Sequence, residues 1–534
     1  MHSTFFNRNF QVSNYLAINL LLLLQLISFF SFSQETKKIE ILNSGYGESD
    51  ETLAANAQRL VDNVLIRHNE ILMWCDTAYI YSGTNKVDAI GNVHIKQGDT
   101  LHLYANNVFY DGDISFARAW DNVVLINKAI KLYSDTLDYD LENNICYYDD
   151  FGKIIDSTTT ITSNIGKYFI DENNIYLNQN VDGYNQDFTL KSDTVQYNTE
   201  TGKLFVVGST TIRDSINTLY TENGWYNTNT GEAELKKKST ILGETQQIDA
   251  NYIKYNKVNG TGLALGSVKI QDIENSSIIL GEIAEYNDIE GTAMVTDSAV
   301  YITYDDSDTL YLHADTLRIV PDTIEGEKII SAYYGVRFFR TSIQGLCDSL
   351  TYFTKDSIIQ LDQDPVIWSE IHQLSAEKIE MKQITDGPDE LHLTNNSFII
   401  SKQDTGQFDQ IKGKEMIGYI VNQELTKINV NGNGQTLYYA REEEEIIGLN
   451  RAESGEISIL FKEGQINKII FLSSPRGELK PHLDLSNKEK ELTGFDWKIE
   501  QRPLSKDDIF PKQEILIDDE IDSINEEPHK KGEN

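Results

Sequence analysis

The chain has 534 residues and carries 83 acidic against 46 Lys and Arg side chains, a formal net charge of −37 at pH 7. Nucleic acids and anionic membrane surfaces attract proteins through clustered Lys and Arg, so this balance argues against a nucleic-acid partner. Aromatic and β-branched residues are abundant, Asn, Asp and Gly interrupt them about every ten residues, and sustained helical periodicity is lacking. These features predict an all-β protein.

Residues 1–33 have the features of a cleaved signal peptide. Arg8 precedes the apolar stretch Leu16–Phe32, which ends at the small residues Ser31 and Ser33. The alternative is an uncleaved membrane anchor, although the stretch is close to the lower length limit for a span and contains two polar amides. We therefore expect the protein to be exported.

A unit of about 29 residues then recurs. The stretch LYSDTLDYDLENN at 132–144 returns as LKSDTVQYNTETG at 190 and LYTENGWYNTNTG at 219. With Ser134 taken as position 0, this position is always small, an aliphatic residue recurs at position −2, and tyrosine is frequent at position +5. A fixed period of this size is typical of repeat architectures. The position 0 residues are Cys75, Ala105, Ser134, Ser163, Ser192, Thr221, Ala250, Gly281, Ala314, Cys347 and Ala376.

The parity of these positions predicts a bend in every unit. Residues two apart in a strand share a face, so −2 and 0 point one way, while +3 and +5 are an odd number of steps away. Both sets are apolar or small, and both can face the interior only if a bulge or corner lies between 0 and +3. Asp, Asn, Ser and Thr gather there, as in SDT at 134–136, and their side chains can bond backbone groups freed at the bend.

Each unit also contains a second apolar segment after a polar turn, such as VVGSTTI at 206–212. One unit therefore crosses the body twice, and stacked units form two facing antiparallel sheets over one elongated apolar interior. The regular repeats extend over residues 34–383. Residues 384–502 are expected to continue the β-stack less regularly, as a second domain of the same kind or an extension, and residues 503–534 to form an acidic disordered tail.

The unit LYANNVFYDGDISFARAWDNVVLI at 103 and the segment VDAIGNVHIKQGDTLHLYANNVFY at 87 resemble the OstA-like (organic solvent tolerance A) family, which includes periplasmic lipopolysaccharide-transport bridge proteins. The resemblance implies a V-shaped β-jellyroll whose apolar inside passes lipid acyl chains. It also implies a Gram-negative periplasmic protein, associated with the outer membrane, that contacts lipopolysaccharide or a related glycolipid. Other lipopolysaccharide-transport proteins would join it by edge-to-edge sheet contact, and copies of the chain could join end to end.

The candidate groove-lining residues are the aliphatic residues at −2 and the tyrosines at +5. The tyrosines have two interpretations, as core packing between the sheets or as rings lining a lipid groove with their hydroxyls near its mouth. The expected lipid-binding set is Leu103, Tyr110, Leu132, Tyr139, Ile161, Tyr168, Leu190, Tyr197, Leu219, Tyr226, Ile248 and Tyr255.

No catalytic, metal or cofactor site is expected. The three cysteines match no metal motif, the nine histidines are scattered, and no nucleophile elbow or phosphate-binding glycine loop occurs. The leading hypothesis is a non-enzymatic lipid-binding conduit or scaffold in lipopolysaccharide transport and outer-membrane assembly. The alternatives are an exported right-handed β-helix that acts on or binds carbohydrate, because β-helix coils have similar periods, and a structural surface protein.

Overall fold

The computed structural model describes residues 38–511 except 50–56, 82, 158, 275, 305–307, 324–325, 404–405, 422–423, 443–444, 464, 482 and 484. The signal peptide expected at residues 1–33 lies outside the described residues. The chain divides into two compact units, the first with residues up to 185 and 196–200, the second with 186–195 and residues from 201 onward. None of the helices in the described part of the chain is long and apolar enough to cross a membrane.

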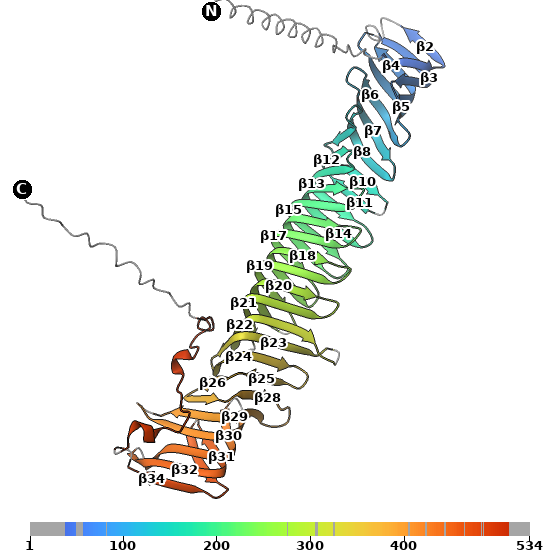
Figure 1. The fold of residues 1–534 in the computed structure, drawn as a ribbon. Coiled ribbons are helices and arrows are strands. Elements are labelled where there is room, and N and C mark those ends of the chain that lie inside the picture. The colour runs from blue at the N-terminus through green and yellow to red at the C-terminus, as the bar shows by residue number, and fades with distance from the viewer. Residues whose placement is uncertain are drawn as a thin grey trace, which may run out of the picture. The chain divides into compact units, whose positions relative to one another are not determined.

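The first unit is a stack of antiparallel strands (Figure 1). Its strands are β1 (Glu40–Asn43), β2 (Tyr46–Ser49), β3 (Ala57–His68), β4 (Ile71–Tyr81), β5 (Lys86–Gln97), β6 (Leu101–Asp111), β7 (Phe116–Asn127), β8 (Ile130–Asp140), β9 (Ile145–Tyr148), β10 (Gly152–Asp156), β11 (Thr159–Ser163), β12 (Ile165–Phe169) and β13 (Asn174–Tyr184). Strands β3 to β8 pair with their neighbours along the chain, and short strands also pair across one or two intervening strands, as β10 with β8 and β12 with β9. Strand β14 (Phe188–Asn198) has residues in both units.

The second unit has the same antiparallel pattern, beginning with the pair of the strands β15 (Lys203–Asp214) and β16 (Thr218–Asn227). Its other long strands are β17 (Glu232–Leu242), β18 (Gln246–Asn256), β19 (Thr261–Asp272), β20 (Ser277–Asn287), β21 (Thr292–Tyr304), β22 (Thr309–Pro321), β23 (Lys328–Arg340), β24 (Ile343–Phe353), β29 (Asp389–Lys402), β30 (Phe408–Val421), β31 (Glu424–Glu442) and β32 (Glu445–Lys462). Its short strands are β25 (Ile358–Asp362), β26 (Val366–Ser369), β27 (His372–Ser375), β28 (Lys378–Lys382), β33 (Gln465–Phe471) and β34 (Arg476–Lys480). The all-β class and the two antiparallel crossings per repeat are confirmed.

The bend expected between positions 0 and +3 is present. On β8, Leu132 and Ser134 are buried, and so are Leu137 and Tyr139, an odd step further on. The β7–β8 register shifts at this point, because two residues of β7 face one residue of β8. The same shift recurs in the neighbouring pairs β5–β6 and β6–β7 and in pairs of the second unit. Below, half-sheet A denotes the strand halves with positions −2 and 0, and half-sheet B those with +3 and +5.

At most bends, the two bulge residues that face a single residue of the partner strand have left-handed backbone conformations. On β7 they are Asp121 and Asn122, with φ of 63° and 58°. Asn, Asp and Gly adopt this conformation at the lowest cost, which explains why they recur there. At Lys237 and Lys238, which have no such preference, the carboxylate of Glu222 binds both ammonium groups at 2.8 and 2.6 Å. These bonds lower the pKa of Glu222 to about 2.

Glu222 stands at position +1, and other residues of this column bind the bulge of the neighbouring strand in the same way. Asp193 accepts a hydrogen bond from the backbone N–H of Ser209 at 3.1 Å, and Glu377 accepts one from Asn396 Nδ2 at 2.7 Å. The hydroxyl at position 0 acts inside the bend, since Ser134 Oγ donates to the carbonyl of Thr136 at 2.7 Å. Polar side chains at the bend thus satisfy its backbone, as the sequence predicts.

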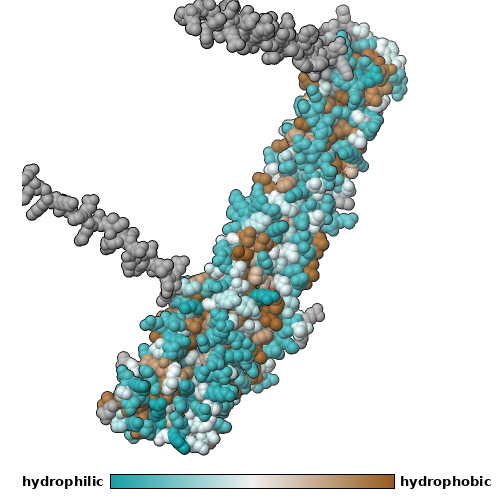
Figure 2. Space-filling view, viewed as in Figure 1, coloured by the Kyte–Doolittle hydropathy of each residue, from teal (hydrophilic) through white to brown (hydrophobic). Residues whose placement is uncertain are grey.

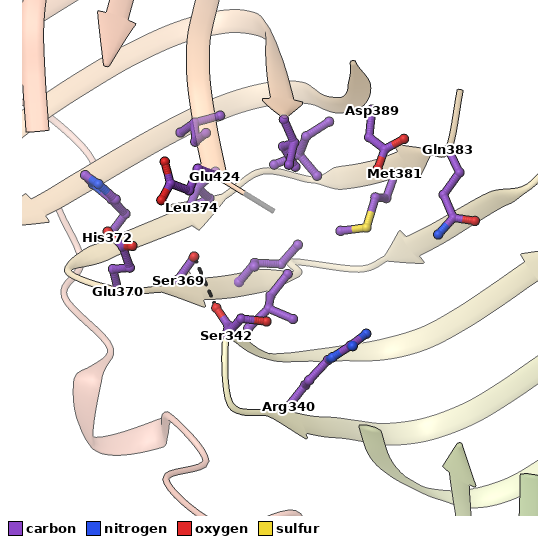
Figure 3. A pocket seen from close by; sticks show the side chains of 15 residues that line it. Arg340, Ser342, Ser369, Glu370, His372, Leu374, Met381, Gln383, Asp389 and Glu424 are labelled. Carbon is purple, nitrogen blue, oxygen red and sulfur yellow. Dashed lines mark hydrogen bonds between the residues drawn. The ribbon is translucent and has the colours of Figure 1, made fainter. Parts of the chain in front are cut away.

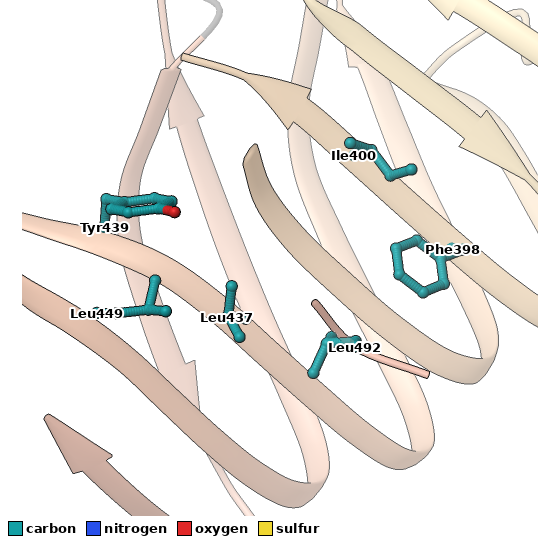
Figure 4. Close-up of a cluster of buried hydrophobic side chains, with 6 residues drawn as sticks. All are labelled: Phe398, Ile400, Leu437, Tyr439, Leu449 and Leu492. Carbon is teal, nitrogen blue, oxygen red and sulfur yellow. The ribbon is translucent and has the colours of Figure 1, made fainter. Parts of the chain in front are cut away.

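A C-terminal strap, residues 485–511, lies on the outer face of half-sheet A in the second unit. Its Leu492 is buried against apolar side chains of β29, β31 and β32 (Figure 4). Strand β29 therefore buries side chains on both faces around residues 397–401. The sheet residues in this cluster are Phe398, Ile400, Leu437, Tyr439 and Leu449.

Buried glutamines of the sheet hold the backbone of the strap. Gln373 Nε2 donates to the carbonyl of Asp496 at 2.7 Å, and its Oε1 accepts from the N–H of Lys498 at 2.8 Å. Gln410 makes the same pair of bonds nearer the start of the strap, to the carbonyl of Lys490 and the N–H of Leu492. Each amide side chain thus replaces the two hydrogen bonds that a neighbouring strand would supply.

The strap differs from the expected organisation at the C-terminus. An acidic tail was expected from Pro503, and a β-stack up to residue 502. Instead, the strands end at Lys480 of β34, and Ile509 of the strap is only 1% exposed. The apolar side chains in the sequence DDIFP explain the difference, because they dock on the sheet despite the neighbouring acids. Residues 512–534 lie outside the described residues.

The face of the molecule seen in Figure 2 is mainly hydrophilic, with scattered hydrophobic side chains. By contrast, the inward positions of both half-sheets are apolar and buried.

Leu132→Asp is therefore expected to destabilise the first unit by more than about 4 kcal/mol, because it places an unpaired charge inside. The matched control is Lys131→Asp, at an exposed position of the same strand, with an expected change within about 0.5 kcal/mol. Equal midpoints in denaturant unfolding for the two variants would show that position −2 does not face inward.

Asp409 on β30 predicts a pH dependence of the second unit. It is 7% exposed and accepts hydrogen bonds from the Tyr439 N–H at 2.9 Å and Gln403 Nε2 at 2.7 Å. Burial raises its pKa to about 6. Between about pH 4 and 6 the unfolded chain ionises this group before the folded chain does, so stability falls as pH rises, by on the order of 3 kcal/mol in total.

Asp409→Asn is expected to remove this component. Thermal unfolding at pH 4 and at pH 7 measures it: relative to the wild type, the variant should gain stability as the pH rises. A constant difference between the two proteins across this range would contradict the assignment to Asp409.

Candidate lipid-binding interior

The twelve residues expected to line a groove all lie between the half-sheets. Their side chains are 0–4% exposed. Leu103, Leu132 and Ile161 in the first unit, and Leu190, Leu219 and Ile248 in the second, belong to half-sheet A, while the tyrosines belong to half-sheet B. The structure thus gathers the predicted residues along the interior of each unit. Whether they contact lipid stays a prediction.

The tyrosine hydroxyls connect the two half-sheets across the interior. They do so at the strand ends farthest from the bend, which are called the free ends below. Tyr139 Oη donates to Gln97 Oε1 at 2.6 Å, and Gln97 is the last residue of β5, at the free end of half-sheet A. Asn127, the last residue of β7, donates from Nδ2 to Tyr168 Oη at 2.9 Å. These partners are about 41–42 residues apart, so each bond spans the interior rather than joining paired strands.

Further bridges follow the repeat. His68 Nδ1 lies 2.6 Å from Tyr110 Oη, and Tyr197 Oη donates to Asp156 Oδ2 at 2.6 Å. In the second unit, Asn217 Nδ2 donates to Tyr255 Oη at 3.2 Å. Burial raises the pKa of Tyr255 to about 12, so its hydroxyl remains neutral and can donate or accept.

The partners of these tyrosines were not predicted from the sequence, although they follow the same repeat. His68, Gln97, Asn127 and Asp156 are 29, 30 and 29 residues apart, the same period as the tyrosines. Aligning the last residue of the second strand in each repeat reveals this polar column in the sequence. That these residues bond the tyrosines becomes clear only from the fold, since the partners lie more than one repeat apart along the chain.

The bridges end within the second unit. Tyr286 Oη is buried and has no hydrogen-bond partner among the described residues. Further along, position +5 is Ile319, then the half-buried Tyr352, then Met381. The mouth between the half-sheets therefore lacks a tyrosine bridge at Met381.

A cavity of about 340 Å³ lies at this level. Ile343, Ile367 and Leu374 line it from half-sheet A, and Met381 and Leu391 from half-sheet B. Both crossings are split here, into β25 and β26 and into β27 and β28. Figure 3 shows Ser342, Ser369 and Arg340 on one wall and Met381, Gln383 and Asp389 on the other.

The rim of the cavity is polar and mainly acidic. Glu370, Asp389 and Glu424 contribute three carboxylates against the single guanidinium of Arg340. Arg340 Nε also lies 3.6 Å from Asp308 Oδ2. His372 lines the cavity as well. In the part of the chain that the structure describes, no group of three or more His, Cys, Asp or Glu side chains could hold a metal ion.

The tyrosine bridges predict a contrast between two identical substitutions. Tyr139→Phe removes a hydrogen bond across the interior and should cost about 0.5–1.5 kcal/mol of stability. Tyr286→Phe removes a buried hydroxyl that has no described partner, so it should be neutral or stabilising. Chemical denaturation of both variants measures the difference. A cost at Tyr286 equal to that at Tyr139 would show that the hydroxyl bonds are not what distinguishes these positions.

Comparisons with known proteins give one family match. Residues 36–193 match the model of the family described as OstA-like protein. The crystal structure of LptH from Pseudomonas aeruginosa, the LptA-homologous periplasmic component of the conserved lipopolysaccharide transport device, is similar at 13% identity and a TM-score of 0.19, over 22% of this chain and 81% of that chain. No curated protein matches. The family resemblance drawn from the repeat motifs is thus confirmed over residues 36–193, which are an OstA-like region.

Proposed function

We propose that the protein is a non-enzymatic, periplasmic lipid-binding conduit or scaffold in lipopolysaccharide transport and outer-membrane assembly. The observation that carries the proposal is the repeated apolar interior between the half-sheets, within a chain whose residues 36–193 match the OstA-like family. A conduit must offer equivalent contacts at successive steps, whereas an ordinary binding pocket confines them to one place. The repeat supplies such contacts, because nine of the eleven units present an aliphatic residue at −2 and each presents an apolar residue or a tyrosine at +5.

The hydrogen bonds of the tyrosine bridges would themselves offer little resistance to an entering acyl chain. One bridging hydrogen bond contributes about 1 kcal/mol net. Burying an acyl chain contributes about 0.8 kcal/mol for each methylene group. A chain that enters between the half-sheets could therefore offset the loss of a tyrosine bridge with its first few methylenes.

The strand edges support contact with other proteins of the same transport system. Strands β1 and β2 are short and almost wholly exposed, and β34 is exposed at every position. In the described residues β1 and β2 pair only with β3, and β34 only with β32. Unpaired strand edges accept an additional strand from another chain. The same edges would serve an end-to-end homo-oligomer.

The pairing argues against the β-helix alternative. Coils of a right-handed β-helix stack in parallel, whereas the described strand pairs are antiparallel in both units. A carbohydrate-active β-helix is therefore not compatible with the fold. A purely structural surface protein has the same antiparallel body and is separated from a conduit by lipid contact alone.

Photo-crosslinking in cells tests the conduit. A crosslinking amino acid at inward tyrosine positions should capture glycolipid, and the same probe at the neighbouring outward positions should capture little, because adjacent strand residues face opposite sides. The inward positions are Tyr139, Tyr168, Tyr197 and Tyr226, and the outward controls are Asp138, Lys167, Gln196 and Trp225. Equal capture at both sets, or none at the tyrosines in folded protein, would leave the structural role.

A further inference from the structure

We propose that the cavity at Met381 binds one acyl chain of an amphiphile whose headgroup carries an amine and a single phosphate. The inference rests on the proposed function, because it takes the space between the half-sheets to be lipid-binding space. It goes further by naming one position in the second unit and one class of ligand.

The walls and size of the cavity fit a single chain. Aliphatic side chains and the thioether of Met381 approach it from both half-sheets, so a methylene chain would replace water on two sides. A volume of about 340 Å³ is near the lower end of the range for small-molecule sites, which suits one chain rather than several. The polar side chains lie at the rim, where a headgroup would remain in water.

The rim charges select the headgroup. Three carboxylates, from Glu370, Asp389 and Glu424, attract an ammonium group and repel a headgroup with several phosphates. The guanidinium of Arg340 can donate hydrogen bonds to one phosphate. A zwitterionic headgroup with one amine and one phosphate therefore complements the rim better than a purely anionic one.

The C-terminal strap fixes the outside of the same wall. Arg502 donates from Nε to Gln344 Oε1 at 2.8 Å and from Nη1 to the carbonyl of Glu370 at 2.9 Å. Glu370 belongs to the rim, and Gln344 is next to the lining residue Ile343. The strap thus holds the turn that carries one of the three carboxylates.

Native mass spectrometry of the delipidated full-length protein provides the test, with two single-chain probes of equal chain length. Lysophosphatidylethanolamine carries the amine, and lysophosphatidylglycerol lacks it. We expect one equivalent of the amine lipid to bind about five- to tenfold more tightly than the anionic lipid. Glu370→Gln combined with Glu424→Gln should bring this ratio close to one.

A cavity-filling variant localises the site. Met381→Trp should weaken binding of the amine lipid at least tenfold, because the ring occupies the space between the half-sheets. Lys382→Trp adds the same bulk on the opposite face of β28 and should leave binding unchanged. Melting temperatures of both variants establish that they fold. Equal affinity for the two lipids, or unchanged binding by folded Met381→Trp, would overturn the proposal.

Photo-crosslinking and lysolipid binding together distinguish failure of the cavity site from failure of the conduit. Glycolipid capture at the inward tyrosines, together with unchanged lysolipid binding by Met381→Trp, would retain the conduit and reject the cavity site. Lysolipid binding that depends on Met381, without capture at the tyrosines, would support the cavity site and reject the conduit.

Discussion

The structure depends on the bend that lets one strand bury two sets of residues of opposite parity. Without it, a strand that buries Leu132 and Ser134 would expose Leu137 and Tyr139 to water. The bend requires two left-handed residues on the neighbouring crossing, a conformation that costs most residues about 1–2 kcal/mol each. Asn, Asp and Gly reduce this cost, and the position +1 side chains bind the bulge from the adjacent strand. The apolar interior exists because this local arrangement repeats.

The residue at position +5 of the repeat then determines how the two half-sheets meet along the interior. At most of the tyrosines from Tyr110 to Tyr255, the hydroxyl at position +5 reaches a polar residue at the opposite free end, as between Tyr139 and Gln97. Where it is Met381, no hydroxyl spans the mouth and a cavity remains. One architecture therefore provides a bridged interior and an accessible one without any change in strand pairing.

The sequence predicted the features that repeat and missed those that do not. The strand content, the two crossings, the bend and the burial of the −2 and +5 columns all follow from periodicity and parity, which are local properties. The bridging partners, such as His68 for Tyr110, lie 42 residues away and become neighbours only once the stack exists. The sequence does not single out the cavity, because the tyrosine column is interrupted at Ile319 as well as at Met381. The strap escaped detection because its contacts depend on outward-facing glutamines, which elsewhere in a sheet would simply be solvated.

The strap also gives the second unit an order of assembly. Each repeat contacts its sequence neighbours, so the stack can form progressively from short loops with little closure entropy. The strap instead joins residues separated by 158 positions, as between Arg502 and Gln344. The strap follows all of its partner strands in the chain, so until it docks these strands present to water the part of their outer face that it covers. Before the strap docks, Phe398 and Leu437 lack the cover of Leu492, so an incompletely folded chain offers a chaperone an apolar surface that the finished protein does not.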